Sequence, residues 1–544
     1  MHRHNIKKIC LALLVACSAA TGAMAAPKAD STAGKAEDPA FSVPVVENPI
    51  SSQDIKDLQI VEDGKRWLVR DKALQQYGIY PNRTKKGQYW FRLPATEDGK
   101  VLWKDRNVSL TLPGTESKEG RNISISHVRR PLGISYVLEP DHMELLPAPR
   151  PERSALELRQ QPLPEGEVMK KYGRDALGMV LLWDPVMDEN APVPPLRTKQ
   201  PVVSPCAFRI TKDGVLLRNP DFDTLLMEWK AKGYAVWPLV DNNFNPGQTH
   251  DILSRKEMRE QLIKELIGYG ILYEFSGYNI DFENVNYSDK GLLTQFVREF
   301  SDAARTYGLK TSIDVTPLSD SPNWSLVYDR AALGQSVDYV MLMAYDQVGR
   351  TSPVAGPTAT YPWVQTAIVN MLKFVPADKV ILGMPLYMRI WYEADDGKDL
   401  PKDIESWPVS VKASAQTGVA PAQAGAAPAR TGTAKAKPKL FVRTLTMADS
   451  HRVREKYASS ITWDADLGLY YLDTRLPKGR LRIWFEDEKS LKEKISLIHT
   501  YQLAGASFWR KGFEPENFWH GFAKHECQAF LKMSRKKLFI SPKL

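Results

Sequence analysis

Short apolar runs alternate with helical patterns through the second half of the chain. Residues 254–271, 291–308 and 490–505 place apolar side chains at the helical period. Eight further runs are nearly continuously apolar, as strands buried on both faces are. They are LGMVLLWDP, VVSPCAFRI, YAVWPLVDNN, SGYNIDFENV, LKTSIDVTP, VDYVMLMAYDQ, KVILGMPLYMRIW and GASFWRKGF. Eight such strands alternating with helices predict an α/β fold, a (β/α)8 TIM barrel, over residues 174–524.

An insertion interrupts this alternation between the seventh and eighth predicted strands. It spans about residues 392–480 and carries strand and helix patterns at its two ends. Its middle, residues 414–439, is rich in Ala, Pro, Gly and Thr without a hydrophobic period, so we expect it to be disordered. Loops after barrel strands border the active face, so we expect the ordered part to form one wall of a cleft.

A different pattern precedes the barrel. Residues 49–147 hold short alternating runs such as KRWLVR and QYWFRLP between turn residues, which predicts a small β-rich domain. Its second half loosely resembles the copper-amine-oxidase-like modules of bacterial envelope proteins, and an unrelated β-rich spacer fits equally well. We interpret residues 26–48 as a flexible tether, residues 148–173 as a linker and residues 525–544 as a basic tail.

The first 25 residues have the pattern of an export signal. A basic start is followed by a short apolar run and by Ala23-Met24-Ala25, a small-x-small cleavage pattern. We therefore expect removal of residues 1–25 and an exported protein, in the cell envelope or outside the cell. The alternative is a lipoprotein, because Leu14-Val15-Ala16-Cys17 resembles a bacterial lipobox, and a lipidated Cys17 would attach the chain to a membrane.

Composition and charge narrow the classes of function. A chain with 43% hydrophobic and 25% charged residues is typical of a soluble globular protein. The formal net charge of +9 is a mild excess over 544 residues, and no basic stripe carries interleaved aromatics, so we expect no nucleic-acid partner. Cys206 and Cys527 remain beyond the signal and could form one disulfide. No Cys/His cluster has the spacing of a metal site.

Two acids stand out in the fourth predicted strand, FSGYNIDFENVN, residues 275–286. Alternate strand residues point the same way, so Asn279, Asp281 and Glu283 share one face and Ile280 and Phe282 the other. The apolar pair would meet the outer helices, and the polar row would point into the barrel. Burying a carboxyl group costs free energy. A catalytic role at the C-terminal end of the strand best explains why these acids are placed there. The alternative is a buried hydrogen-bonded network that only supports the barrel.

Polar and aromatic side chains also end most of the other predicted strands. They occur in WDP (183–185), VDNN (240–243), IDVTP (313–317), MAYDQ (343–347), PLYMRIW (385–391) and SFW (507–509). Aromatic rings stack on the apolar faces of pyranoses, and carboxylates bind hydroxyl groups. A barrel mouth lined by both is suited to a sugar.

Taken in order, these motifs resemble glycoside hydrolase family 18, the chitinase-like TIM barrels. The fourth strand of that family reads D-x-x-D-x-D-x-E, and here Ser276, Asn279, Asp281 and Glu283 hold the aligned positions. Ser276 and Asn279 replace two acids, which puts rate and pH optimum in doubt more than the reaction. NIDFEN is most similar to the branch that includes spore-cortex and cell-wall N-acetylglucosaminidases.

The resemblance extends to the later strands. MAYDQ resembles the sixth-strand motif M-x-Y-D and gives Met343, Tyr345 and Asp346. GMPLYMRIW resembles the seventh-strand motif, with Tyr387 conforming and Met388 in place of a usual Gly. GASFW resembles the eighth-strand segment and ends in Trp509, the expected floor of the sugar site.

The family resemblance implies retaining, substrate-assisted hydrolysis of β-linked N-acetylglucosamine polymers without a metal or organic cofactor. Glu283 would be the acid and base, Asp281 would orient the substrate's acetamido group, and Tyr345 would hold its carbonyl oxygen. The substrate-binding residues would be Asn279, Asp346, Met343, Trp509 and Tyr387. We expect a monomer acting on a carbohydrate polymer, with peptidoglycan as the leading substrate and chitin as the alternative. A catalytically silent lectin-like protein is a third hypothesis, disfavoured because Glu283 is present.

Overall fold

The computed structural model describes residues 58–147 and 177–395, each with short gaps, and residues 404, 439–516 and 518–519. The predicted signal, tether, linker and basic tail lie outside these residues, as does nearly all of the segment expected to be disordered (414–439). Cys17 and Cys527 also lie outside them, and Cys206 is a buried free thiol.

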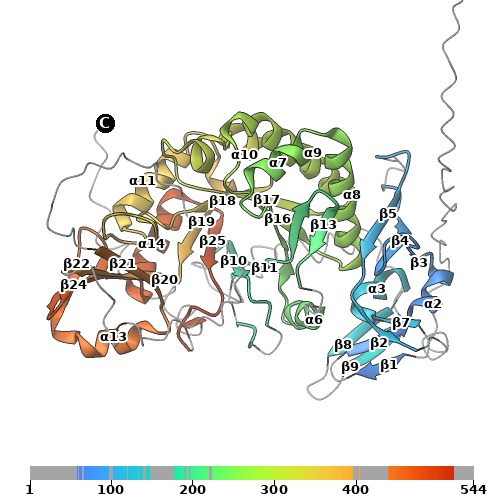
Figure 1. The fold of residues 1–544 in the computed structure, drawn as a ribbon, viewed down its shortest axis with the longest axis horizontal. Helices are drawn as coiled ribbons and strands as arrows, with labels where there is room; N and C mark the ends of the chain where they lie inside the picture. Colours follow the sequence, from blue (N-terminus) through green and yellow to red (C-terminus); the bar gives the residue numbers. More distant parts are fainter. Residues whose placement is uncertain are drawn as a thin grey trace, which may run out of the picture. The chain divides into compact units, whose positions relative to one another are not determined.

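A barrel of parallel strands carries the candidate site (Figure 1). In sheet order its strands are β15 (Leu239–Asp241), β16 (Gly277–Asp281), β17 (Lys310–Val315), β18 (Tyr339–Met343), β19 (Val380–Pro385), β25 (Gly505–Trp509), β10 (Met179–Asp184), β11 (Gln200–Pro205) and β14 (Ala235–Val236). Every neighbouring pair in this series is parallel. Only Trp237 and Pro238 separate β14 from β15, so the sheet returns to the segment where it began. This confirms the predicted (β/α)8 barrel.

Amphipathic helices flank these strands. They are α6 (Asp223–Ala231), α7 (Pro246–Leu253), α8 (Lys256–Leu272), α9 (Lys290–Thr306), α10 (Arg330–Ser336), α11 (Tyr361–Met371) and α14 (Glu488–Tyr501). The three helices expected from the sequence correspond to α8, α9 and α14. Helix α9 shows why, because its buried residues include Leu293, Phe296, Val297 and Phe300, one stripe at the helical period.

Two further predicted strands each divide at a proline, as YAVWPLVDNN does at Pro238 between β14 and β15. VVSPCAFRI forms β11, which ends at Pro205, and then β12 (Phe208–Thr211), which pairs with β13 (Gly214–Leu217) and β15. KVILGMPLYMRIW forms β19, which ends at Pro385, and then β20 (Tyr387–Ala394) in another sheet. Proline has no N–H to donate to a neighbouring strand, so the chain can change its pairing partners at these positions without losing a ladder hydrogen bond from that residue.

The insertion forms an antiparallel sheet of its own (Figure 1). Its strand order is β21 (Lys439–Thr446), β20, β24 (Gly479–Phe485), β23 (Leu469–Leu476) and β22 (Ile461–Asp464), and α13 (Ser450–Lys456) follows β21. The sheet begins at Tyr387, ahead of the expected start near residue 392. As a result, a residue predicted for the sugar site comes from the insertion sheet.

The region before the barrel is rich in strands, as expected. One sheet joins β1 (Val61–Asp63), β2 (Arg66–Arg70), β7 (Gly120–Ser124) and β6 (Gly114–Ser117), a second joins β3 (Tyr80–Pro81), β4 (Gln88–Arg92) and β5 (Asn107–Thr111), and β8 (Ile134–Leu138) pairs with β9 (Met143–Pro147). Two helices accompany them, α2 (Asp71–Leu74) and α3 (Ile125–Leu132). The Thr111 N–H donates to the hydroxyl of Tyr269 on α8 at 3.1 Å.

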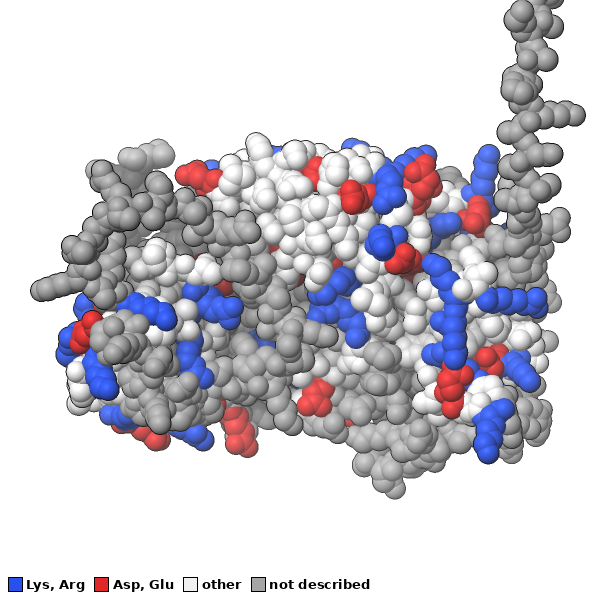
Figure 2. All heavy atoms as spheres, viewed as in Figure 1, with Lys and Arg blue, Asp and Glu red and all other residues white. Residues whose placement is uncertain are grey.

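Charges of both signs lie interspersed over the described surface that Figure 2 shows. This matches the mixed-charge surface expected for a net charge of +9 over the whole chain. Within the ranges that the structure describes, no helix combines the length and the apolar character needed to cross a membrane.

Candidate active site

The polar row of β16 points into the barrel. Asn279 accepts a hydrogen bond from the indole Nε1 of Trp183 on β10 at 2.7 Å, and both side chains are fully buried. Phe282 faces the other way and stacks on Phe296 of α9 with ring centroids 5.5 Å apart. The alternation expected from the sequence is therefore confirmed. It arises because successive strand side chains leave opposite faces of the sheet.

Asn279 lies beneath the other polar residues of the site. Its Nδ2 donates to Asp314 Oδ1 on β17 at 2.7 Å and to Ser312 Oγ at 3.1 Å. Both ends of its amide are thus used inside the barrel, and among the described residues it makes no hydrogen bond to Asp281. The substrate contact expected for Asn279 stays a prediction. The structure places Asn279 where it orients Asp314.

Asp281 is nearly enclosed, with 8% of the residue exposed. Its Oδ1 is buried and has no hydrogen-bond partner in the described structure. Burial first, and then the neighbouring Asp241, raise the pKa of this carboxyl to about 7. Asp241 ends β15 and lies directly across from Asp281 in the strand register.

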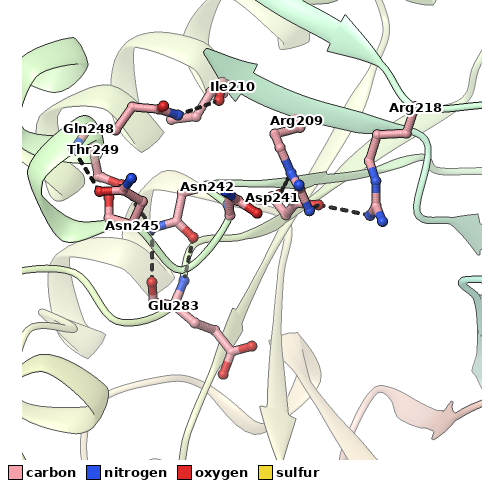
Figure 3. Close-up of polar contacts among 10 residues, drawn as sticks. Arg209, Ile210, Arg218, Asp241, Asn242, Asn245, Gln248, Thr249 and Glu283 are labelled. Atoms are coloured by element: carbon pink, nitrogen blue, oxygen red, sulfur yellow. Dashed lines mark hydrogen bonds and ion pairs between the residues drawn. The ribbon is translucent and has the colours of Figure 1, made fainter. Parts of the chain in front are cut away.

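Asp241 is held by two arginines. Arg209 donates to both of its oxygens, at 2.6 and 3.2 Å, and Arg218 donates to Oδ2 at 2.9 Å (Figure 3). These bonds hold the Asp241 carboxylate in place. Its charge beside Asp281 helps to raise the pKa of Asp281.

Glu283 follows β16 and is held through its backbone. Asn242 Oδ1 accepts the Glu283 N–H at 3.1 Å, and Asn242 Nδ2 donates to the Glu283 carbonyl at 2.8 Å. The carboxyl group extends away from this clamp, and no hydrogen bond joins it to another described residue (Figure 3). Its pKa is raised well above the usual range by burial, and then by Asp281, Asp314, Asp346 and Asp241.

Asn242 is in turn held by the start of α7. Its Nδ2 also donates to Thr249 Oγ1 at 2.9 Å, and Thr249 Oγ1 donates to the Asn245 carbonyl at 2.7 Å. Asn245 caps the helix, since its Oδ1 accepts the Gln248 N–H at 3.0 Å (Figure 3). The backbone of Glu283 is thereby tied to a helix terminus by a short chain of hydrogen bonds.

Asp346 connects the barrel to the insertion sheet. It follows β18 with a left-handed φ of 59°, and its Oδ1 accepts a 2.5 Å hydrogen bond from the Tyr387 hydroxyl of β20. Arg389, two residues along β20, pairs with the same oxygen and is only 5% exposed. The predicted residues Asp346 and Tyr387 thus lie together, and Arg389 completes the group.

Aromatic rings surround the carboxyl cluster. Trp183 lies 5.9 Å from Trp509 and 6.4 Å from Tyr345 between ring centroids, the latter pair edge to face. Tyr345 lies 6.4 Å from Tyr387 in the same way. Burial raises the pKa of the Tyr345 hydroxyl, with further contributions from Asp314, Tyr387, Glu283 and Asp281. The hydroxyl therefore stays protonated and is available as a donor.

Two further residues are aligned with the family motifs. Ser276 precedes β16, at the end of the strand away from Glu283, and its Oγ accepts the Val236 N–H at 3.2 Å. Met343 ends β18 and is 7% exposed. The serine therefore does not approach the carboxyl cluster.

Of the residues near the cluster that were not predicted, three differ in the signal that the sequence carries. Asp314 occupies a strand, IDVTP, whose alternation places it on the same inward face, so its sequence carried the signal. Asn242 lies in VDNN, but its bond to Glu283 spans 41 residues and leaves no local pattern. Trp183 lies in WDP, where the sequence gives no sign of its bond to Asn279.

The carboxyl cluster is suited to proton transfer in a largely buried site. Asp281, Glu283 and Asp314 all have raised pKa values, because burial and mutual repulsion oppose the loss of their protons. Such carboxyl groups can act as general acids near neutral pH. In the part of the chain that is described, no group of three or more His, Cys, Asp and Glu side chains has metal-site geometry.

A barrel with a carboxyl cluster and aromatic rings at the carboxyl ends of its strands is suited to a carbohydrate-active enzyme. The model of the glycosyl hydrolases family 18 matches residues 241–513. The chain belongs to this family and is a glycoside hydrolase, as the strand motifs indicated.

Relatives of known sequence include two proteins of Bacillus subtilis. The uncharacterized glycosylase YvbX is 26% identical over 326 residues, which cover 58% of this chain and 82% of that protein. The cortical fragment-lytic enzyme is 23% identical over 320 residues, 57% of this chain. The chain spans 65% of the length of that second relative, slightly under two thirds.

Solved structures share the fold. A chitinase from Chromobacterium violaceum aligns with a TM-score of 0.51 at 21% identity, covering 64% of this chain and 99% of its own. The Bacillus cereus spore cortex-lytic enzyme SleL aligns with a TM-score of 0.51 at 16% identity, covering 72% of this chain and 86% of its own. At these identities the similarity concerns the fold alone.

Proposed function

We propose that the protein is an exported, retaining hydrolase of β-linked N-acetylglucosamine polymers and that peptidoglycan is its substrate. The observation that carries the chemistry is the position of Asp281, which ends β16, and of Glu283, only two residues further along the chain. Two carboxyl groups so placed cannot flank a glycosidic bond as ordinary acid and nucleophile do. Substrate assistance removes the need for a second flanking carboxylate.

In this mechanism the carbonyl oxygen of the substrate's 2-acetamido group attacks the anomeric carbon. Glu283 gives its proton to the departing glycosidic oxygen, and a cyclic oxazolinium ion forms. Glu283, now a carboxylate, removes a proton from water, which attacks the same carbon and opens the ring with retained configuration. The raised pKa of Glu283 keeps it protonated for the first step at neutral pH.

The neighbouring residues have defined roles in this proposal. Asp281, whose Oδ1 has no partner among the described residues, accepts the acetamido N–H and stabilises the positive charge of the oxazolinium. The Tyr345 hydroxyl donates to the acetamido oxygen. Trp509 provides an apolar floor, and Asp346 and Tyr387 bind the sugar at the insertion side. Asn279 acts from below by fixing Asp314.

Peptidoglycan is favoured by the curated relatives and by the predicted export. The cortical fragment-lytic enzyme is named for action on the spore cortex, which consists of peptidoglycan. The signal-like first 25 residues would deliver the chain to the compartment where that polymer lies.

Chitin is the second candidate, because a chitinase shares the fold. A silent lectin-like protein is the third, but it would not need the retained Glu283 with its raised pKa.

The mechanism is tested with an N-acetylglucosamine hexamer and NMR detection of the first anomer released. We expect the β-anomer from the wild type, and a loss of turnover of about 10²–10⁴-fold in Glu283→Gln with binding of the hexamer preserved. Glu299→Gln on α9, which pairs with Arg259 far from the cluster, is the matched control and should behave as wild type. Initial release of the α-anomer, or full activity in Glu283→Gln, would contradict the mechanism.

A further inference from the structure

Arg510 is a buried cation that the proposed mechanism does not use. It directly follows Trp509 and is 5% exposed. Its guanidinium lies 4.1 Å from the ring centroid of Phe513, and Phe513 lies 6.3 Å from the ring of Tyr387. No described residue accepts a hydrogen bond from this guanidinium, and its Nε is fully buried. An arginine in such surroundings normally has a carboxylate partner.

The charges of Asp184 and Glu514 act on Arg510, but both acids also have other partners. Asp184, at the end of β10, forms an ion pair with Lys511 at 3.6 Å and accepts the Met187 N–H at 3.1 Å. Glu514 accepts hydrogen bonds from the Gly512 N–H at 2.7 Å and the Trp519 indole at 2.9 Å. The positive charge of Arg510 is therefore only partly compensated by its neighbours.

A second excess of positive charge lies at the end of β15, where two arginines bind Asp241. Asp241 is shared by Arg209 and Arg218, so one carboxylate faces two guanidinium groups. The side chains of these arginines are 23% and 16% exposed, respectively. Arg218 makes one of the three bonds and Arg209 makes the other two, so Arg218 has donors to spare.

The two groups lie at the same end of the barrel. Arg510 directly follows β25, and Asp241, which accepts a bond from Arg218, ends β15. Asp281 ends β16 at the same edge of the sheet.

We propose that Arg510 and Arg218, with Arg209 beside them, bind carboxylates carried by the glycan and so select peptidoglycan over uncharged chitin. This inference rests on the proposed function and specifies the substrate of the same site. N-acetylmuramic acid carries a lactyl carboxylate when its stem peptide has been removed, and the peptide carries carboxylates when it is present. Chitin has neither. The planar guanidinium binds a carboxylate through two parallel hydrogen bonds, which a hydroxyl cannot match.

The test measures the activity of the mature chain on three forms of one substrate. They are intact glycan chains with stem peptides, peptide-free chains with lactyl carboxylates, and peptide-free chains whose carboxylates have been converted to methylamides. An N-acetylglucosamine hexamer is the neutral reference. We expect the wild type to prefer the peptide-free carboxylate form over its amide by about tenfold in kcat/KM, the effect of one charge-assisted hydrogen bond.

Variants assign this preference to the arginines. In Arg510→Gln and in the double variant with Arg218→Gln, the ratio of carboxylate to amide should fall towards one through a rise in KM. Arg510→Lys keeps the charge and should keep part of the preference. Arg480→Gln in the insertion sheet removes an arginine that pairs with Asp473, and it should leave the ratio unchanged. Arg218→Gln alone is the second variant if thermal unfolding shows Arg510→Gln to be misfolded, since Asp241 keeps both bonds from Arg209.

The outcomes separate this inference from the proposed function. If the wild type cleaves glycan chains but does not distinguish carboxylate from amide, or if the double variant keeps the wild-type ratio, the inference is wrong and the proposed function stands. A preference that appears only with intact stem peptides would assign the arginines to peptide carboxylates, as the inference allows. Cleavage of the hexamer without cleavage of any glycan chain would overturn both the peptidoglycan assignment and the inference.

Discussion

Asn242 is the residue that most directly sets the position of Glu283. Its amide makes one bond to each backbone group of Glu283, and it is 1% exposed. Without this amide the backbone of Glu283 is no longer held, so its carboxyl group can shift. A displacement of a catalytic group by about 1 Å lowers the rate by about 10²-fold.

Asn242→Ala should therefore lower kcat on the hexamer by about 10–100-fold with little change in KM. Asn370→Ala on α11, where the side chain accepts a bond from Lys373, is the matched control and should not change kcat. An equal rise in KM with unchanged kcat would mean that Asn242 acts on binding and not on the position of the acid.

Asp281 should make stability depend on pH. Its folded pKa of about 7 lies above the value of an unfolded aspartate, near 4. Between these two values the folded state holds a proton that the unfolded state has lost, so rising pH lowers the free energy of unfolding, by at most about 1.4 kcal/mol per pH unit. Above the folded pKa the effect is constant.

Asp281→Asn removes this titration. Its free energy of unfolding relative to the wild type should increase from about pH 4 to about pH 7 and then level off, as measured by urea denaturation at each pH. Asp302→Asn, which changes an exposed ion pair on α9, should show a much smaller dependence. A difference between Asp281→Asn and wild type that does not vary with pH would contradict the raised pKa.

At the scale of elements, β16 enters the barrel through a close approach at Gly277. A Cβ at this position would lie 2.6 Å from the Lys310 carbonyl oxygen and 2.9 Å from the ring of Trp237. Gly277→Ala should therefore lower stability by about 1–3 kcal/mol, seen as a lower melting temperature. Gly291→Ala, in the first turn of α9 with open space around it, should be neutral or stabilising by up to about 1 kcal/mol. Equal effects of the two substitutions would contradict this packing at the start of β16.

Much of this element-scale structure is legible in the sequence, because periodicity is a local property. The inward row of β16 and the buried stripe of α9 follow from periods of two and about 3.6 residues. The division of KVILGMPLYMRIW at Pro385 was not predicted, because both halves are apolar and buried. Which sheet each half joins depends on partners as distant as Leu445, which pairs with Met388.

The site was legible only in part for the same reason. Each of Asp281, Glu283 and Tyr345 lies in a motif formed by consecutive residues at the end of a single strand. Asn242 is identified by its bonds to Glu283, and Arg510 by a buried Nε without a hydrogen-bond partner among the described residues. Both features depend on residues from separate strand ends. A residue defined by what surrounds it in space has no signature in its neighbours along the chain.

In the whole molecule, a glycoside hydrolase barrel follows a predicted export signal, and the proposed substrate is a polymer outside the cell. The charges interspersed over the face in Figure 2 give no large field of one sign to draw in an anionic polymer. In the proposed function, recognition of peptidoglycan depends instead on the carboxyl ends of the barrel strands, where the carboxyl cluster lies.

The most direct test of the account is a digest of purified peptidoglycan by the chain from residue 26 onward, read by mass spectrometry beside Glu283→Gln and beside chitin oligomers. The account predicts fragments with N-acetylglucosamine at the new reducing end, formed by the wild type and absent from the variant. Fragments ending in N-acetylmuramic acid, release from chitin alone, or the same fragments from Glu283→Gln would contradict it.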